Sequence, residues 1–397
     1  MSGKRANGEG NVYQRANGRW EARLSYIDHD TGKRRRVSFY ASTAKAARQK
    51  MKEARDRIDE GKPPKDATST VGAWLAHWRA TTLAASDRKE STQQLYATLC
   101  RKHLEVPPFG AIPLDKLRPS DVEALVLAMR AKTKPGKRID VDTEPEPVRA
   151  LSDSTIRQTY TVLRAALDGA VRDGLLARNP AALVKRPGVE RREARHLDAD
   201  AVAAVLRHAE TSRYHAALVL IASTGLRKGE ALGLAWDRVD LDGGALKVAS
   251  TLGRIGDRLV ISEPKTDRAR RTVPLNPAVV AMLRKHRTAQ KEERLRAANQ
   301  WQDSGLVFTT ELGAPVDPRN LLRVIEVAAQ AAGVEGVGVH TLRHSAAVAW
   351  LESGVHIKAV ADLLGHSSIA ITGDVYGHTS DNTARAAVDG LAERLGL

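Results

Sequence analysis

Apolar side chains recur at helical spacing through most of this 397-residue chain. Val71, Trp74, Leu75 and Trp78 fall at i, i+3, i+4 and i+7, which places them on one face of an α-helix. Similar spacing predicts further helices at about 92–104, 152–174, 214–223, 277–299, 318–332, 340–353 and 358–364. Short helices are also expected after Asp198, at Arg227 and at Tyr376.

Two regions alternate between apolar and polar residues instead, as strands do. The first contains predicted strands at 11–15, 18–27 and 34–40, followed by a helix at about 43–60. The second contains predicted strands at 239–241, 245–248, 258–261 and 271–274, with a hairpin turn expected between the last two. A capping box is predicted at Ser120, where the sequence Ser-Asp-Val-Glu precedes an apolar stretch.

Polar segments at 61–65 and 186–195 are predicted linkers, and they divide the chain into blocks 1–62, 70–187 and 196–397. The charged, proline-containing segment 133–148 is predicted as a flexible loop. The expected fold is multidomain and mainly α. A small three-stranded β-sheet with a helix comes first, then a helical domain, then a mixed α+β domain.

The chain is strongly basic, with 63 Lys+Arg against 47 Asp+Glu, a net charge of +16. Residues 1–62 carry 16 basic and 8 acidic residues, so half of the surplus lies in the first block. This balance indicates a polyanionic partner, most simply a nucleic acid. Seven basic residues on or beside the first strands are candidate DNA contacts: Arg15, Arg19, Arg23, Lys33, Arg34, Arg35 and Arg36.

A single cysteine, Cys100, excludes an internal disulfide and a multi-cysteine zinc site, and it fits a reducing cytoplasm. The sequence contains no apolar run long enough to span a bilayer and no apolar signal segment at its beginning. We therefore expect a cytoplasmic protein that does not interact with membranes.

The strongest indication of chemistry is a lone tyrosine after a group of basic residues. Seven tyrosines are present, yet none lies between Tyr214 and Tyr376 and none follows Tyr376. A hydroxyl nucleophile among fixed cations suits attack on a phosphodiester, because cations stabilise the charge that builds on the phosphate. The phosphotyrosine ester would store the energy of the broken bond, so neither ATP nor a metal ion is expected.

The surrounding residues suggest separate roles. Arg227 and Arg343 are candidates for a clamp on the nonbridging oxygens, because the guanidinium group offers paired donors. Lys265, in the expected hairpin turn, is a candidate general acid, and His340 and His366 are candidates for binding the phosphate or moving a proton. Each residue alone has an ordinary structural explanation, and their joint occurrence in this order is what points to a site.

The sequence disfavours a zinc site at His340 and His344. The two residues are four apart on one helix face, but Thr341 stands where a zinc protease has glutamate, and no third ligand is apparent.

The motifs His340-Thr-Leu-Arg343, Leu363-Leu-Gly-His366-Ser and Asp374-Val-Tyr376 resemble those of the tyrosine recombinases, specifically the phage-type or integrative-element integrases. The resemblance covers residues 196–397. It implies a catalytic set of Arg227, Lys265, His340, Arg343, His366 and Tyr376. Glu230 matches an acidic position that the family places just after its first arginine, and the resemblance implies no cofactor and no metal.

The resemblance also implies roles for the three blocks. Residues 1–62 would be an arm-type DNA-binding domain, 70–187 a helical core-binding domain, and 196–397 the catalytic domain with a carboxyl-terminal tail. Four protomers would join two segments of double-stranded DNA and exchange strands through a Holliday junction in the bacterial host. A host DNA-bending factor and an excision factor are possible partners. The tail 379–397 is a candidate for packing on its own or a neighbouring protomer.

Three alternatives were considered. A chromosome-dimer resolvase of the same family generally lacks an arm-binding domain, which block 1–62 resembles. A DNA-binding regulator without catalysis conflicts with the complete catalytic set. A metal-dependent transposase needs an acidic triad, and none stands out in the sequence.

Overall fold

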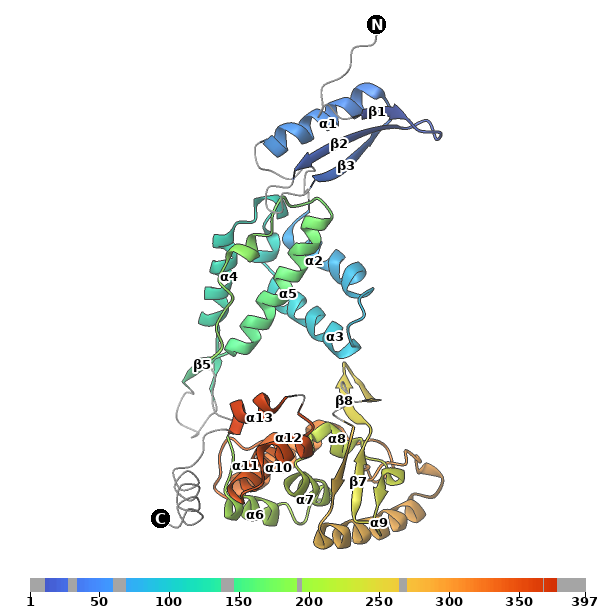
Figure 1. Ribbon diagram of the computed structural model, residues 1–397, viewed down its shortest axis with the longest axis vertical. Helices are drawn as coiled ribbons and strands as arrows, with labels where there is room; N and C mark the ends of the chain where they lie inside the picture. Colours follow the sequence, from blue (N-terminus) through green and yellow to red (C-terminus); the bar gives the residue numbers. More distant parts are fainter. Residues whose placement is uncertain are drawn as a thin grey trace, which may run out of the picture. The chain divides into compact units, whose positions relative to one another are not determined.

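The structure is a computed structural model that describes residues 11–27, 34–59, 69–136, 146–190, 195–263, 270–366 and 368–376 (Figure 1). For 371 and 374–376 it describes the backbone alone. The chain divides into two compact units, Met1–Arg191 and Arg192–Leu397. Their boundary lies within the polar segment 186–195. The carboxyl-terminal tail 379–397 lies outside the described residues.

The first unit begins with an antiparallel sheet in the order β1-β2-β3, and one helix covers one of its faces (Figure 1). The elements are β1 (Asn11–Gln14), β2 (Trp20–Ile27), β3 (Arg34–Ala41) and α1 (Ala44–Asp59). Alternation along the strands directs Ala22, Leu24 and Phe39 toward Ala47 and Ala54 of the helix, where all five are buried. The three predicted strands and the predicted helix are confirmed.

The rest of the described part of the first unit is mainly helical. Its helices are α2 (Val71–Trp78), α3 (Glu90–Leu99), α4 (Pro119–Ala131) and α5 (Asp153–Arg172). All four apolar residues that predict α2 are buried, at 3% exposure or less. Trp74 also donates its indole N–H to the carbonyl of Ala166, at 2.9 Å, so this large side chain fixes α2 on α5.

Helix starts show which local predictions hold. The Ser152 hydroxyl accepts from the Thr155 N–H and caps α5, as the sequence indicates. The capping box predicted at Ser120 is wrong, because α4 begins at Pro119, two residues before the start that a cap at Ser120 would give. Pro119 occupies the first helical position, where its missing N–H costs nothing. The backbone N–H of Arg118 then donates to the Asp121 carboxylate, at 2.8 Å.

The segment predicted as a flexible loop is paired at both ends. Strand β4 (Thr133–Pro135) pairs antiparallel with β5 (Pro147–Arg149). The prediction of a loop is therefore wrong for these residues, while 137–145 lie outside the described part of the chain.

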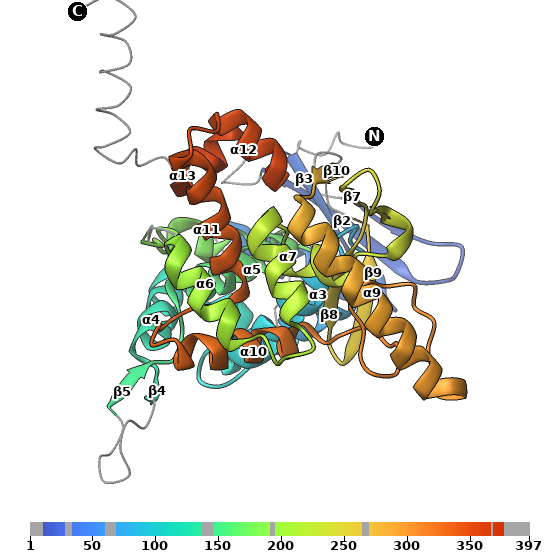
Figure 2. The same cartoon turned by 90° about the horizontal axis from the view of Figure 1, so that it is seen from below.

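Most of the helices that the structure describes in the second unit pack around one buried apolar core (Figures 1 and 2). In chain order the helices are α6 (Ala199–His208), α7 (His215–Thr224), α8 (Lys228–Leu232), α9 (Pro277–Ala297), α10 (Pro318–Ala331), α11 (Val339–Glu352), α12 (Ile357–Leu364) and α13 (Ile369–Tyr376). Leu218 and Ile221 of α7 are fully buried beside Leu342 of α11. This contact sets α11 next to the turn that follows α7. The predicted fold class is confirmed.

The strands of the second unit form two small sheets. Strand β7 (Ala245–Val248) lies between β6 (Val239–Asp240) and β10 (Arg271–Pro274), and β8 (Thr251–Ile255) pairs with β9 (Arg258–Ser262). Strand β8 was not predicted. The predicted hairpin between β9 and β10 is wrong, because these strands belong to different sheets. Lys265, which was placed in that hairpin turn, lies outside the described residues.

Candidate active site

The carboxyl end of α12 is the centre of the candidate site. Gly365 adopts the left-handed conformation (φ 65°), and its N–H donates to the carbonyl of Asp362. The N–H of His366 donates to the carbonyl of Ala361, which completes a Schellman motif. These two bonds leave the next three carbonyls, of residues 363–365, to be satisfied by other donors.

Three arginines from different parts of the unit supply those donors, one for each carbonyl. Arg271 Nε donates to Leu363 O, Arg343 Nη2 to Leu364 O at 2.8 Å, and Arg227 Nη2 to Gly365 O at 3.2 Å. The carboxyl end of a helix carries partial negative charge, so cations are favourable there. The helix end therefore gathers three guanidinium groups that lie far apart in the sequence.

Local structure explains how two of them reach this point. Gly225 ends α7 in the left-handed conformation (φ 62°) and turns the chain so that Arg227 becomes the N-cap of α8. Arg343 lies in the second turn of α11 and is 4% exposed. Its Nη1 donates to the carbonyl of Gly225, so one side chain links the turn after α7 to the end of α12.

Glu230 joins Arg227 to Arg271. Its carboxylate accepts from the Arg227 backbone N–H at 2.9 Å and from Arg227 Nη1 at 2.7 Å. It also accepts from Arg271 Nη2 at 2.9 Å. Burial alone would raise the pKa of Glu230, but hydrogen bonds and charge from Arg271, followed by those of Arg227, lower it below the ordinary value. The buried carboxylate is therefore ionised and shared by two arginines.

The histidines of the site are kept neutral at pH 7. Burial, followed by the charges of Arg343 and Arg227, lowers the pKa of His366 to about 4. Burial and nearby cations also lower the pKa of His340, although solvent reaches its ring. The ring of His366 shares a 2.8 Å hydrogen bond with the buried hydroxyl of Thr372 in α13.

The remaining two residues of the predicted set are only partly placed. Tyr376 is the last residue of α13, one helical turn after Thr372, and its backbone alone is described. Lys265 lies outside the described residues, between Ser262 at the end of β9 and Arg271 at the start of β10. The structure thus brings Arg227, Glu230 and Arg343 together by direct contacts at the end of α12, where His366 follows Gly365, and His340 stands three residues before Arg343 in α11.

Sequence reasoning missed two residues of this cluster. Arg271 was read only as the start of a strand in a basic stretch. The alternation of 271–274 does place Arg271 and Val273 on one face of β10, and Val273 is buried. An arginine on a buried strand face was the available indication. Thr372 could have been found from its position four residues before Tyr376, one turn along the same helix.

The outer face of the amino-terminal sheet carries a second polar cluster. Glu21, 1% exposed, accepts hydrogen bonds from Arg23 Nε at 2.8 Å, Tyr13 at 2.7 Å and Arg15 Nε. Hydrogen bonds, above all the one from Arg23, lower the pKa of Glu21 to about 2, although burial by itself would raise it. Arg23 lies over the Tyr13 ring and Arg15 over the Tyr40 ring, and these cation–π contacts help to hold both guanidinium groups against the sheet.

The other predicted DNA contacts divide between two faces. Arg19, Arg34 and Arg36 are exposed. Arg35 shares its face of β3 with Val37 and Phe39, which pack against α1, so it does not belong to the same surface. Lys33 lies outside the described residues.

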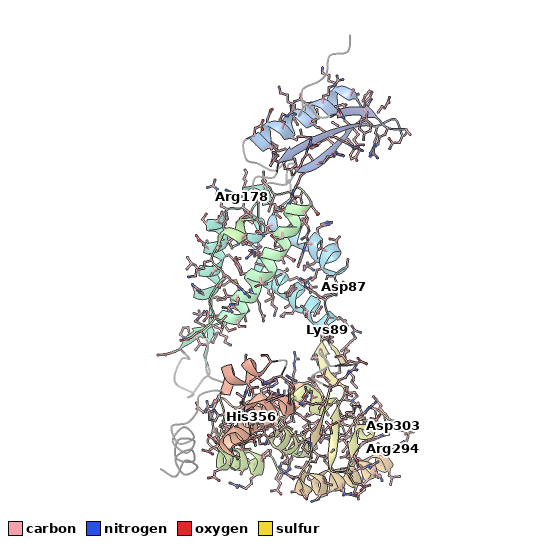
Figure 3. All side chains as sticks on the ribbon, in the orientation of Figure 1. Asp87, Lys89, Arg178, Arg294, Asp303 and His356 are labelled. Atoms are coloured by element: carbon pink, nitrogen blue, oxygen red, sulfur yellow. The ribbon has the colours of Figure 1, made fainter. Side chains whose placement is uncertain are left out.

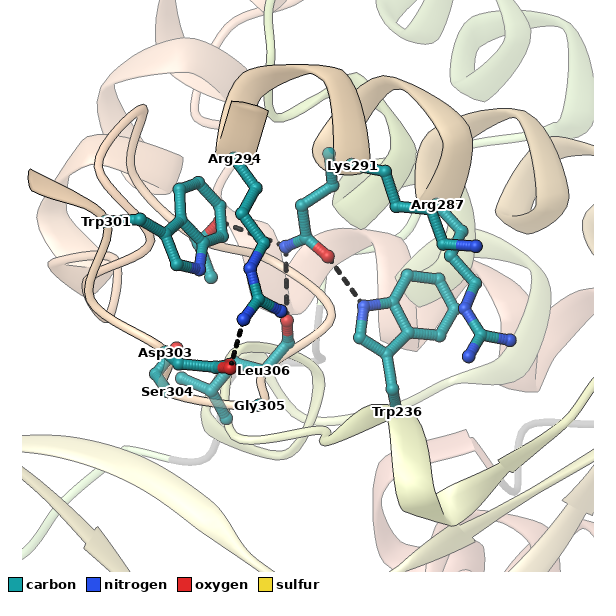
Figure 4. A pocket seen from close by; sticks show the side chains of 11 residues that line it. Trp236, Arg287, Lys291, Arg294, Trp301, Asp303, Ser304, Gly305 and Leu306 are labelled. Atoms are coloured by element: carbon teal, nitrogen blue, oxygen red, sulfur yellow. Dashed lines mark hydrogen bonds and ion pairs between the residues drawn. The ribbon is translucent and has the colours of Figure 1, made fainter. Parts of the chain in front are cut away.

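A third cluster, on α9, is structural (Figures 3 and 4). Trp236 donates to Gln290 Oε1 at 2.6 Å, and Gln290 Nε2 donates to Leu306 O at 3.2 Å. Arg294 pairs with Asp303 at 3.0 Å beside a hollow of about 160 Å³. These bonds fasten the segment after α9 to the helix.

Within the described ranges, no cluster of three or more His, Cys, Asp or Glu side chains has the arrangement to hold a metal ion. Among the helices that the structure describes, none combines the length and apolar character needed to cross a bilayer.

Comparisons with known proteins agree with this geometry. Residues 195–383 match the phage integrase family. An integrase from Streptomyces ambofaciens is 28% identical over 411 residues, which cover 99% of each chain. A tyrosine recombinase XerC from Xylella fastidiosa is 32% identical over 235 residues, which cover 58% of this chain and 71% of the relative.

A solved structure of the Tn1549 transposon integrase in complex with a circular intermediate DNA shares the fold. Its TM-score is 0.64 at 21% identity, and the match covers 82% of this chain and all of that chain. With these matches and the family motifs in place, the chain belongs to the phage integrase family of tyrosine recombinases.

Proposed function

We propose that the chain recombines DNA at specific sites through a covalent 3′-phosphotyrosyl intermediate, as an integrase that inserts or excises a phage or another mobile element. One observation carries the proposal. Arg227, Arg343 and His366, from three separate segments, meet at the end of α12, and the family motif assigns all three to the scissile phosphate.

In the proposed reaction, the phenol oxygen of Tyr376 attacks phosphorus and the bond to the 5′ oxygen breaks. Lys265 gives a proton to the leaving 5′ oxygen, and His340, neutral at pH 7, is suited to accept the phenol proton. A 5′-hydroxyl from the second DNA strand then attacks the phosphotyrosine ester and releases Tyr376. This is the chemistry of a type IB topoisomerase, and it requires neither ATP nor a metal ion.

Arg227 and Arg343 bind the nonbridging oxygens in this proposal. Their guanidinium groups are held before substrate arrives, because the carbonyls of residues 364 and 365 fix them. Preorganised donors of this kind stabilise a transition state without reorganisation during the reaction. The Arg227 side chain is 37% exposed, so a phosphate can reach it.

The three blocks of the chain divide the DNA-binding roles between them. Residues 70–187 and 196–397 together hold the crossover site, and residues 1–62 bind flanking arm sites. The guanidinium groups of Arg15 and Arg23, which lie over tyrosine rings on the outer sheet face, support the arm-binding role. Four protomers act on two DNA segments in the cytoplasm of a bacterial host, where a DNA-bending factor and an excision factor assist.

A chromosome-dimer resolvase and an inactive regulator remain the competing functions. Relatives described as integrases and as XerC-like recombinases both match more than nine-tenths of the chain, so their coverage does not separate the two functions. The amino-terminal sheet favours the integrase, because chromosome-dimer resolvases of the family generally lack an arm-binding domain. The intact arginine cluster favours catalysis over a regulator.

The test is incubation of the full chain with nicked candidate attachment-site DNA in EDTA. The nick lets the cleaved fragment diffuse away, so the covalent product accumulates. We expect a 3′-phosphotyrosyl adduct at Tyr376, detected by mass spectrometry and as a slow band in a denaturing gel. Tyr376→Phe should bind the same DNA and form no adduct. An adduct retained in this variant would contradict the assignment of the nucleophile.

A further inference from the structure

Arg271 has a place in the site that the catalytic motif does not account for. Its side chain is 7% exposed, and its guanidinium group is held by acceptors within the protein. Nη2 donates to Glu230 Oε2 at 2.9 Å, Nη1 lies 3.3 Å from Glu230 Oε1, and Nε donates to the carbonyl of Leu363. One guanidinium group therefore connects the acidic residue of α8 with the end of α12.

Charge balance shows what this contact does for Arg227. Glu230 is ionised and touches both Arg227 and Arg271, so one negative charge faces two positive charges. With Arg271 present, Glu230 is neutralised without consuming the charge of Arg227. Without Arg271, the single negative charge of Glu230 would be balanced by Arg227 alone. A phosphate beside Arg227 would then meet little net positive charge.

We propose that Arg271 is a positioning residue for strand cleavage, which neutralises Glu230 so that Arg227 keeps its charge and its orientation for the scissile phosphate. The inference rests on the proposed function. Arg271 acts through Glu230 and through the Leu363 carbonyl, one residue from the carbonyl that holds Arg343. Arg271 thereby helps to fix the orientation of Arg227 and Arg343, the two arginines of the phosphate clamp.

The experiment compares single-turnover cleavage of nicked attachment-site DNA by four proteins: wild type, Arg271→Met, Glu230→Gln with Arg271→Met, and Arg213→Met. Arg213 is the matched control, because it also donates to a carboxylate (Glu293) and to a backbone carbonyl (Thr309), but in another part of the unit. Thermal unfolding and DNA affinity are measured for each protein, so that a folding defect is recognised.

We expect Arg271→Met to cleave about 10- to 100-fold more slowly, the range that loss of a supporting partner typically costs. DNA affinity should change less than about threefold. The double variant should regain part of the rate, because removing the buried carboxylate frees the charge of Arg227 again. Arg213→Met should cleave at the wild-type rate at a temperature where it is folded.

A substrate with a neutral methylphosphonate at the scissile position separates electrostatic positioning from simple packing. Such a linkage carries no charge to neutralise, so the defect of Arg271→Met should shrink on it. Equal defects on both substrates, with no recovery in the double variant, would reduce Arg271 to a packing role and overturn the inference. If wild-type protein itself formed no adduct, the proposed function would fall, and this inference with it.

Discussion

Replacing Arg343 with alanine tests the structure and the chemistry together. The variant removes the donors that hold the carbonyls of Gly225 and Leu364 in a nearly solvent-free site. A buried acceptor left without its donor costs about 1–3 kcal/mol. The two together should lower the free energy of unfolding by about 2–6 kcal/mol. In a unit of this size that corresponds to a fall in Tm of about 4–24 °C.

The sequence alone suggests that Arg343→Ala would leave folding intact, and the burial of Arg343 changes that expectation. Loss of one preorganised donor to the transition state should also slow cleavage by about 10²- to 10³-fold. Both effects are measurable on the same preparation, with thermal unfolding for the first and single-turnover cleavage at 20 °C for the second. Arg343→Lys serves as the control that keeps the charge but loses the paired donors.

Two outcomes would refute the reasoning. An unchanged Tm would show that the bonds to Gly225 and Leu364 contribute nothing to stability. If the cleavage rate fell only in proportion to the fraction of protein unfolded at 20 °C, Arg343 would not stabilise the transition state at the phosphate.

Three further predictions concern other parts of the chain. His344 and His366 have pKa values lowered to about 4 in the folded state, so the unfolded chain binds more protons between pH 4 and about 6.5. The folded protein should therefore lose stability as pH falls through this window. A thermal midpoint that stays constant from pH 7 to 4 would contradict the burial of these rings. An isolated fragment of residues 1–62 should bind arm-type DNA with an affinity that falls steeply with salt, because about one counterion is released for each phosphate neutralised. Glu21→Gln should weaken this binding by releasing Arg15 and Arg23 from the sheet. An affinity that does not change with salt would contradict the arm-binding role. Gly225→Ala should lower both Tm and cleavage, because a Cβ there would stand 2.8 Å from Leu364 Cδ2 at a φ of 62°; wild-type values for both would show that this turn tolerates a side chain.

Local patterns predicted most of the helices because their cause is local. The spacing of Val71, Trp74, Leu75 and Trp78 follows the helix period, and Ser152 caps the helix that follows it. The error at Ser120 was also local: Pro119 prefers the first helical position, which moved the cap to Arg118.

The errors in the second unit have a different cause. Strand pairing depends on partners that are distant in sequence, so alternation at 258–261 and 271–274 predicted strands but not that each would pair elsewhere. The role of Arg271 depends on Glu230, 41 residues earlier, and on Leu363, 92 residues later. The family motif supplied the positions of Arg227 and Arg343, but neither motif nor pattern showed that a helix end would hold them.

The order of these contacts along the chain has a consequence for synthesis. Arg227 precedes its carbonyl partner, Gly365, by 138 residues, Arg271 precedes Leu363 by 92 and Arg343 precedes Leu364 by 21. A nascent chain that ends before Leu363 carries all three guanidinium groups but none of these acceptors. The arginine cluster can therefore form only after the ribosome has added residues 363–365, however early the arginines themselves are made.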